Sequence, residues 1–279
     1  MMLHILKGFS IAGKISVLLI LALCFMAVFA PQLVRHPWDT PSGPALQAPN
    51  REHILGTDDL GIDLWAQICY GARNSILVGI GTALLSSLIG VFLGIVSGYF
   101  GGITDLIVTA AIDILMAIPS LPIMIVAGAF FGPSTKNIII ILSLLSWVMP
   151  ARIIRSKVLA LKEESYIKVA KGYGASFSYI TFKHFMPQIF PICATSFIKL
   201  ISRAIVSEAS LSFLGLGDPT SKSWGLILNF ALNFRGIYFT DYWKWWVVYP
   251  LAFIIILVLS TATLSRELER VLDIKIAGQ

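Results

Sequence analysis

Residues 165–187 read SYIKVAKGYGASFSYITFKHFMP, a basic stretch between two strongly apolar parts of the chain. Four of its residues recur at the i, i+3, i+4 and i+7 spacing of one helix face: Tyr166, Val169, Ala170 and Tyr173. Gly174 follows them, and glycine readily adopts the left-handed conformation that ends a helix. The stretch is therefore predicted to begin with a short amphipathic helix.

The second half of the stretch predicts another short helix. Ser176 is a suitable N-cap for a helix that continues through Phe177, Ile180 and His184. Pro187 is expected to stop this helix before the next apolar segment, because proline lacks a backbone N–H. Residues 165–187 thus form a predicted helical hairpin with one apolar face and an otherwise basic surface.

Two interpretations of this hairpin are open from the residues alone. An amphipathic helix with a basic face can lie on anionic lipid. A helix with small residues at the centre of its apolar face can instead dock in a groove on another protein. Ala170 and Gly174 favour docking, since small residues permit close approach whereas lipid binding favours bulky ones.

The composition of the chain is that of a membrane protein. Of its 279 residues, 57% are hydrophobic and 13% are charged, and the mean hydropathy is +0.83. Soluble domains carry about 25% charged residues. The net charge of +6 is therefore better explained by the placement of basic residues around membrane helices than by nucleic-acid binding. The three cysteines form no CxxC pair and are expected to be unpaired: Cys24, Cys69 and Cys193.

The apolar segments predict an all-α protein with six transmembrane helices, because about 20 apolar residues cross a bilayer as a helix. The expected spans are residues 15–34, 74–104, 105–131, 137 to beyond 147, 188–211 and 245–265. The first is too long for the core of a cleaved signal peptide, and Pro31 would directly follow the cut, so it is expected to be retained. The last span begins with three predicted interfacial anchors: Trp243, Trp245 and Trp246.

Glycine and proline mark two of these spans. Gly90, Gly94 and Gly98 recur every four residues, so they either let another helix approach closely or are merely tolerated. Pro119 and Pro122 are expected to bend or break the third span.

Charged residues inside the spans are candidates for a transport pathway or a subunit seam. Asp113 lies about 12 Å along the helix from Asp105, so it should face protein or water. Lys199 and Arg203 share a helix face that should line a cavity or another subunit, and Glu208 follows them. The alternative for these groups is a structural ion pair or a partner contact. Three cations near the end of the fourth span are expected to reach the membrane surface: Arg152, Arg155 and Lys157.

The distribution of lysine and arginine predicts the orientation. Segment 152–187 contains seven basic residues: Arg152, Arg155, Lys157, Lys162, Lys168, Lys171 and Lys183. The two chain ends add Lys7, Lys14, Arg266, Arg270 and Lys275. The loop 35–73 is net acidic instead, with Asp39, Glu52, Asp58, Asp59 and Asp63 against Arg35, Arg51 and Arg73. Both termini and the hairpin are therefore expected in the cytoplasm, and segments 32–73 and 212–244 outside.

Three stretches resemble a known family. The hairpin is similar to the "EAA" loop of ABC importer permeases, although Lys168 and Val169 replace its Glu and first Ala, while Ala170, Gly174, Ile180 and Pro187 match. HILGTDDLGIDLWAQICYGARNSILVG from residue 53 and SEASLSFLGLGDPTSKSWGLIL from residue 207 resemble the dipeptide, oligopeptide and nickel subfamily, as does GYFGG at 98–102. The chain looks like its shorter, C-type subunit. Ile62 stands where that subfamily commonly has Arg.

The resemblance implies a type I ABC importer permease of a bacterial inner membrane. Such a subunit pairs with a paralogous permease, two ATPase subunits dock on the cytoplasmic hairpins, and an external binding protein delivers the substrate. ATP and Mg are then expected on the ATPases, with no cofactor on this chain. Residues 1–73 would form an N-terminal segment, first helix and outer loop, and residues 74–279 the core with a coupling loop at 162–187. Peptides, nickel and metal chelates are all possible substrates.

The resemblance also assigns residues. It implies that Lys168, Val169, Ala170 and Gly174 contact the ATPase, while Ile180, His184 and Pro187 shape the hairpin. Asp58, Asp59 and Asp63 are expected at the outer mouth, facing the binding protein or a cationic substrate, with capping of the second span as the alternative. His36 and His53 lie in the same loop without tight ligand spacing, so no metal site is predicted.

Other functional classes are less well supported. Residues 8–14, GFSIAGK, approach a Walker loop, but Ile15 replaces its Ser or Thr and a membrane helix follows at once, so ATP hydrolysis is expected on another chain. No HExxH motif indicates an intramembrane enzyme. An ion-coupled transporter or channel acting alone is the alternative, with Asp113, Lys199 and Arg203 as coupling charges, although no internal repeat suggests one.

Overall fold

The structure, a computed structural model, describes residues 8–277, and the side chains of residues 8–271. Lys7 and the side chain of Lys275, which contributed to the predicted orientation, lie outside these residues. The described chain is helical, and its only β-pairing is a single bridge between Thr57 and Asp63. The prediction of an all-α protein is confirmed.

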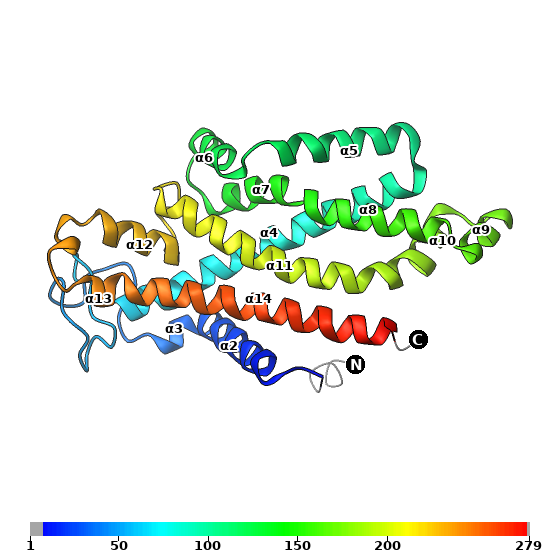
Figure 1. The fold of residues 1–279 in the computed structure, drawn as a ribbon. Coiled ribbons are helices and arrows are strands. Elements are labelled where there is room, and N and C mark those ends of the chain that lie inside the picture. The colour runs from blue at the N-terminus through cyan, green and yellow to red at the C-terminus, as the bar shows by residue number, and fades with distance from the viewer. Residues whose placement is uncertain (1–7, 278–279) are drawn as a thin grey trace.

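Five helical segments are long and apolar enough to cross a membrane on their own. They are α2 (Ile11–Val28), α4 (Leu64–Phe100), α7 with α8 (Thr135–Ser146 and Val148–Lys162), the helix ending in α11 (Met186–Phe213), and the segment containing α14 (Val248–Ala277). A sixth span is bent by 92° between α5 (Gly102–Ala117) and α6 (Ser120–Phe131). Figure 1 shows this bent pair lying along one side of the bundle. The six expected spans are therefore present.

The bend of the sixth span follows from its prolines. α5 ends before Ile118, and Pro119 stands at the N-cap of α6. The residue before a proline is driven to extended backbone, and Ile118 has a ψ of 130°. The predicted break is confirmed.

The two ends of the bundle differ in character (Figure 1). The hairpin helices α9 (Ser165–Gly172) and α10 (Phe177–Ile180) lie at one end, together with the end of α14. The start of α2 is tied to this part of α14, because the Ser10 hydroxyl donates a 2.7 Å hydrogen bond to Glu267. The loop before α4, α12 (Trp224–Asn233) and α13 (Trp243–Trp246) lie at the opposite end. The hairpin and both described chain ends thus share one side.

Helix α4 is the central element and packs most extensively on α8 and α11. Its glycines make the approach to α8 possible. A Cβ on Gly90 would lie 2.7 Å from Pro150 Cβ, and one on Gly94 would lie 2.8 Å from Ala151 O. A Cβ on Gly98 would lie 2.9 Å from Val158. Close helix approach, one of the two explanations for the glycine spacing, is confirmed.

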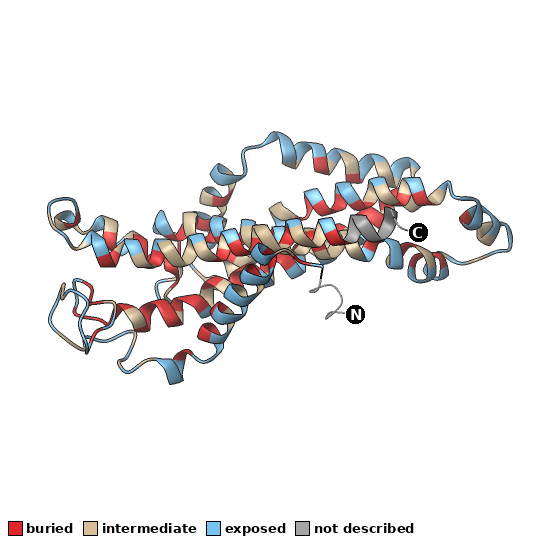
Figure 2. Ribbon diagram, turned by 60° about the horizontal axis from the view of Figure 1, so that its bottom comes forward, coloured by how far each residue is buried: buried red, intermediate tan, exposed pale blue. Residues whose placement is uncertain are grey.

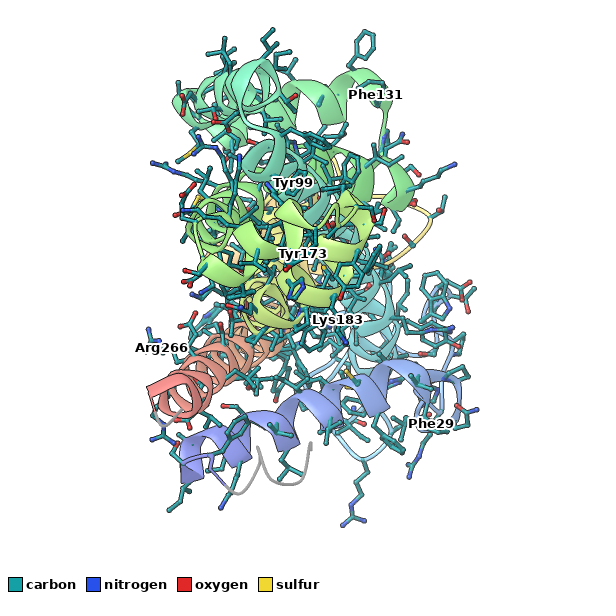
Figure 3. The ribbon with its side chains drawn as sticks, turned by 90° about the vertical axis from the view of Figure 1, so that its right-hand side faces the viewer. Phe29, Tyr99, Phe131, Tyr173, Lys183 and Arg266 are labelled. Atoms are coloured by element: carbon teal, nitrogen blue, oxygen red, sulfur yellow. The ribbon has the colours of Figure 1, made fainter. Side chains whose placement is uncertain are left out.

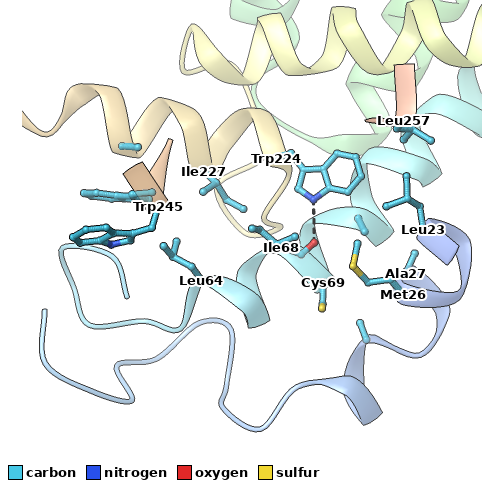
Figure 4. Packing of buried hydrophobic residues seen from close by; sticks show 14 of the residues in the cluster. Leu23, Met26, Ala27, Leu64, Ile68, Cys69, Trp224, Ile227, Trp245 and Leu257 are labelled. Atoms are coloured by element: carbon cyan, nitrogen blue, oxygen red, sulfur yellow. Dashed lines mark hydrogen bonds between the residues drawn. The ribbon is translucent and has the colours of Figure 1, made fainter. Parts of the chain in front are cut away.

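The core at the outer end contains two of the three tryptophans predicted to anchor the last span at the interface. Trp246 is 1% exposed and Trp245 is buried beside it, with its ring N–H donating to Thr57 O at 3.3 Å. Trp243 is the exposed member of the three, at 47%. The interfacial role is therefore wrong for Trp245 and Trp246, because the loop before α4 folds over them. Figure 4 shows the same core around Trp224, which donates to Ile68 O at 3.0 Å.

Much of the outer surface of the spans is apolar and exposed (Figure 2). The outward residues of α2, α5 and α6 include Ile11, Ile103, Leu106, Val126 and Phe130. A soluble chain would not leave such continuous apolar faces uncovered. These faces fit contact with lipid or with another membrane subunit.

Two boundaries differ from the sequence prediction. α4 begins at Leu64, ten residues before the predicted start of this span at residue 74, because Asp63 caps the helix there. The polar side chain of Gln67 in its first turns is buried by the protein. Pro187 does not stop the second hairpin helix, which continues into α11 as one segment from Phe177 to Phe213. Residues Thr181–Phe185 form a π-helical turn in which Met186 N–H bonds back to Thr181 O. The wider turn already interrupts the regular ladder where Pro187 lacks a donor.

Candidate functional site

The hairpin at residues 165–187 forms as its sequence predicted. Gly174 has a φ of +80° and follows α9. Its N–H donates to Lys171 O at 2.9 Å, and Ala175 N–H donates to Ala170 O at 3.0 Å. These two bonds are the pair of a Schellman cap, which needs the left-handed residue that glycine supplies. Ser176 caps α10 by accepting from Tyr179 N–H at 3.3 Å.

Three fully buried side chains anchor the hairpin to the bundle: Ile167, Ile180 and Phe185. They pack in one cluster with Ile154 and Val158 of α8. Ile167 was not among the predicted site residues, because it lies to one side of the apolar face that the periodicity identified. The anchored base makes the hairpin part of the bundle rather than a loose loop.

The predicted apolar face points away from the bundle. Tyr173 is 91% exposed, Val169 and Tyr166 are exposed, and Ala170 is partly exposed. A Cβ added at Gly174 would meet nothing within 4 Å. Figure 3, which views the molecule from this end, shows Tyr173 and Lys183 near the middle of the face. An exposed apolar surface on a rigid base is typical of a docking site.

The remaining predicted hairpin residues surround this face. Lys168 Nζ pairs with Glu163 at 2.8 Å, and this interaction lowers the pKa of Glu163. His184 is flanked by two aromatic rings, with centroids 5.6 Å away at Tyr166 and 5.7 Å away at Tyr179. Pro187 is exposed beside them. His184 thus contacts one aromatic ring from each hairpin helix and links the two helices.

A cation–π contact joins the hairpin to the end of α4. Lys171 Nζ lies 4.2 Å from the centroid of the Tyr99 ring. Burial, then the nearby Lys162 charge, lowers the pKa of Lys171. Tyr99 also packs against Phe177, with centroids 4.8 Å apart. The hairpin therefore contacts α4 as well as α8.

An apolar groove of about 910 Å³ runs between α4 and the hairpin-to-α11 helix. Its walls include Leu88, Val91, Phe182, Phe190 and Phe197. It begins beside the hairpin and follows the α4 face toward the bundle centre. Such a groove fits an apolar helix of a second membrane subunit.

The charges predicted inside the spans do not form one cluster. Asp113 lies on an exposed face of α5. Lys199 pairs with Glu269 of α14 at 2.5 Å, which is the structural ion pair named as the alternative. Arg203 is exposed one turn farther along α11.

Glu208 is enclosed within the chain rather than placed on an open pathway. It is 1% exposed and accepts a 2.6 Å hydrogen bond from Ser212. The Ser212 hydroxyl lies 3.3 Å from Ser223, which caps α12. In this structure α12 folds back and covers Glu208, so its carboxylate does not line an open surface. Its role in the structure is to join α11 to α12.

The three acidic residues of the outer loop have different environments. Asp63 caps α4 by accepting from Ala66 N–H at 2.7 Å, and Asp58 accepts from Ile62 N–H and from Gln67. Both are buried, and the alternative of helix capping applies to Asp63, while Asp58 holds the loop together. Of the three, Asp59 is the exposed one.

His36, Glu52 and His53 come together in the same loop, with ligand atoms within 4.8 Å of one another. The sequence spacing did not indicate this grouping. His53 is 1% exposed, and its Nδ1 lies 2.9 Å from Asp63. Its Nε2 faces Gly43, where a Cβ would collide with it. The Nδ1 contact with Asp63 thus links the loop to the start of α4, while the buried Nε2 has no hydrogen-bond partner among the described residues.

Comparison with known proteins identifies the family. A family model described as "Binding-protein-dependent transport system inner membrane component" matches residues 90–277, which include the hairpin and the last three spans. The chain belongs to this family. It is a permease of an ABC importer, and the resemblance drawn from the hairpin sequence is confirmed.

Relatives of this permease match over nearly its whole length. The oligopeptide transport system permease protein OppC of Bacillus subtilis is 34% identical over 95% of this chain and 86% of its own. The dipeptide transport system permease protein DppC of Alkalihalophilus pseudofirmus is 33% identical over 94% of this chain and 85% of its own. DppC of Bacillus subtilis is 34% identical over 92% and 80%.

A solved structure shares the fold. The MetNI methionine ABC transporter, in inward-facing conformations, contains a chain that matches 72% of this permease with a TM-score of 0.54 and 18% identity. The match covers 94% of that chain. Its coverage agrees with a conserved helical core to which further segments are added.

Proposed function

We propose that this permease forms, with a paralogous permease, the membrane pathway of an ATP-driven peptide importer. Two ATPase subunits dock on the cytoplasmic hairpins, and an external binding protein delivers the peptide. The observation that carries the proposal is the hairpin, whose apolar face is exposed while its base is anchored by Ile167, Ile180 and Phe185. The names of the relatives, oligopeptide and dipeptide permeases, support peptides as the substrate class.

The geometry supports a mechanical role for the hairpin. ATP and Mg bind the ATPase subunits, and closure of the ATPase dimer displaces the docked hairpins. The buried anchors and the Lys171–Tyr99 contact carry this displacement into α8 and α4. Since packed helices move as rigid bodies between discrete arrangements, the pathway alternates between two states. Lys168, Val169, Ala170 and Gly174 form the contact surface in this proposal.

The proposal includes the cellular placement. The permease lies in a bacterial inner membrane with both termini and the hairpin in the cytoplasm, as the lysine and arginine distribution predicts. Residues 74–279 form the importer core, and residues 1–73 add the first helix and the outer loop. Asp113 and Arg203, which are exposed on α5 and α11, face the paralogous subunit or the pathway.

The docking role is tested by placing a charge on the exposed apolar face. Tyr173→Asp should reduce co-purification of the ATPase subunits and peptide uptake at least about tenfold, since a tenfold loss needs only about 1.4 kcal/mol. Tyr238→Asp is the matched control, because Tyr238 is 69% exposed at the opposite end of the bundle. The control should keep ATPase co-purification.

Two results would contradict this proposal. One is unchanged co-purification and uptake in both Tyr173→Asp and a second variant, Gly174→Leu, whose side chain would enter open space on the same face. The other is uptake into vesicles that contain this chain alone, without ATP, which would support the ion-coupled alternative.

A further inference from the structure

A pocket of about 510 Å³ opens at the outer end of the bundle, and none of the roles described so far uses it. The loop before α4 contributes Asp58 and Asp59 to one wall. The segment from the α11–α12 connection to the 3-10 turn at Arg235–Tyr238 contributes Lys222, Phe230 and Arg235. The volume is in the range that holds small ligands. The pocket thus has carboxylates on one side, cations on the other, and aromatic rings between.

The acidic wall offers one available carboxylate. Asp58 is saturated, because one of its oxygens accepts from Leu60 and Ile62 N–H and the other accepts from Gln67. Asp59 is exposed and forms no ion pair with any described residue. Partial burial, then the adjacent Asp58 charge, raises the pKa of Asp59. A cation that reaches Asp59 therefore removes an unfavourable interaction as well as forming a favourable one.

The cationic side chains of the basic wall likewise form no ion pair with any described residue. Lys222 Nζ lies 4.4 Å from the centroid of the Phe230 ring, a cation–π position that holds the ammonium group over the pocket. It forms no ion pair with any described residue, and partial burial lowers its pKa although Asp58 and Asp59 oppose this. Arg235 is exposed beside it. A half-buried lysine without a carboxylate partner favours the arrival of an anionic group.

We propose that this pocket is a binding subsite for a short peptide with both termini free, which meets Asp59 with its ammonium group and Lys222 with its carboxylate. Arg235 reinforces the carboxylate side, and Phe230 and Phe234 accept apolar side chains. This inference rests on the proposed function and names the part of the permease that recognises its substrate. A ligand of one charge would satisfy only one wall, whereas a zwitterion with an apolar body complements all three features.

Lys222 also borders a second cavity, through which the bound peptide can move along α4. Lys222 lines this cavity of about 380 Å³ together with Arg73, Asn74 and Leu77. These three residues belong to α4, along which the apolar groove lies farther toward the hairpin. The carboxylate of a bound peptide would therefore pass from Lys222 toward Arg73 on the α4 face.

The subsite is tested with the complete importer in vesicles, supplied with saturating loaded binding protein. Three probes are used: trialanine, its N-acetylated form and its C-terminal amide. Each rate for a variant is divided by the wild-type rate with the same probe, so that the preference of the binding protein cancels. Lys222→Gln should lower the maximal rate for trialanine at least about fivefold while changing the amide rate less than about twofold, and Lys222→Arg should restore it. A fivefold change corresponds to about 1 kcal/mol.

Replacement of Asp59 tests the side of the pocket that is proposed to bind the ammonium group. Asp59→Asn should slow trialanine and the amide alike while leaving the N-acetylated peptide nearly unchanged, since only the first two carry an ammonium group. Lys244→Gln and Asp241→Asn are the matched controls, because these two residues pair with each other at 2.8 Å on the exposed outer surface. Both controls should behave as wild type with every probe.

Two results would overturn the inference. Equal slowing of all three probes by Lys222→Gln would assign the residue to binding-protein docking or to folding, and no slowing of any probe would leave the pocket without a role in transport. Both are distinguishable from failure of the proposed function, in which the wild-type importer takes up none of the peptides.

Discussion

At the scale of single residues, Gly94 shows how one hydrogen atom sets the distance between two helices. The space that a side chain would need at Gly94 is occupied by Ala151 O and by Ile154 Cβ at 3.0 Å. Both belong to a packed helix rather than to a flexible side-chain end. The close contact of α4 with α8 therefore depends on the absence of a Cβ at this position.

Replacing Gly94 with alanine should destabilise the permease. Overpacking of this kind typically costs about 1–3 kcal/mol, so the unfolding temperature in detergent should fall. Gly172→Ala is the matched control, since Gly172 is also helical and a Cβ there meets nothing within 4 Å. The control should be neutral or gain about 0.5 kcal/mol from helix propensity. An equal effect of both substitutions on thermal unfolding would show that packing at Gly94 is not limiting.

Single residues also show where sequence reasoning is insufficient. The glycine spacing on α4 left close packing and mere tolerance open, and it did not identify the partner helix. The tryptophans at the start of the last span were assigned to the interface by type, yet Trp245 and Trp246 are buried. Whether an amphipathic ring is covered depends on a loop nearly 200 residues earlier in the chain, and Trp245 bonds to Thr57 of that loop. No local pattern contains this information.

At the scale of elements, α5 is attached to the bundle by an apolar cluster, in which Val108 and Ile112 pack on Trp147, and by a charged contact at its first turn. Arg155 of α8 donates two hydrogen bonds to Asp105, at 2.5 and 2.6 Å, and Ser97 of α4 also donates to this carboxylate. Arg155 was expected to reach the membrane surface, and in the structure its guanidinium pairs with Asp105. Bidentate arginine–carboxylate pairs fix orientation as well as distance.

Loss of the arginine should loosen α5 rather than unfold the chain. In Arg155→Gln, hydrogen exchange should increase within Gly102–Ala117 while α4 remains protected, because an unpaired, partly buried carboxylate costs about 1–3 kcal/mol. Arg152→Gln is the control for loss of an arginine on α8, since among the described residues Arg152 pairs with no carboxylate and makes only a 3.4 Å hydrogen bond to Met116 sulfur of α5. If the hydrogen-exchange rates of α5 were the same in the wild type and in both variants, the ion pair would not be what holds this helix in place.

The hairpin illustrates the same division between local and distant information. Its first helix, glycine turn and second N-cap were predicted, because each depends on residues a few positions apart. Pro187 was expected to end the second helix, but the π-helical turn at Thr181–Phe185 lets the helix continue. The continuous segment makes the hairpin one piece with α11. A rigid connection of this kind suits an element that transmits motion.

At the scale of the whole molecule, the permease has one anchored docking end and one loop-rich end. The hairpin and the end of α14 lie together, and the pocket with Asp59 and Lys222 lies at the opposite end (Figure 1). The bundle between them carries the apolar groove along α4. This polarity matches a protein that receives substrate on one side of a membrane and a motor on the other.

The proposed orientation makes a prediction for intact cells. In a chain whose three cysteines are replaced, Tyr238→Cys should react with a membrane-impermeant maleimide, and Tyr173→Cys should react only after permeabilisation. Both positions are well exposed in the structure, so any difference reports the side of the membrane rather than burial. Labelling of Tyr173→Cys in intact cells, with Tyr238→Cys protected, would reverse the orientation.

The sequence by itself determined the six spans, the bent third span, the hairpin and the family, because apolar length, helical period and turn chemistry are local properties of the chain. Only the tertiary structure decided which face of the hairpin is anchored, that Glu208 and Trp246 are enclosed, and that Asp59 and Lys222 meet across one pocket. The physical reason is that burial and charge pairing depend on what another segment places opposite a residue. Asp59 and Lys222 lie far apart in the chain, and the fold of the outer loop against α12 brings them together.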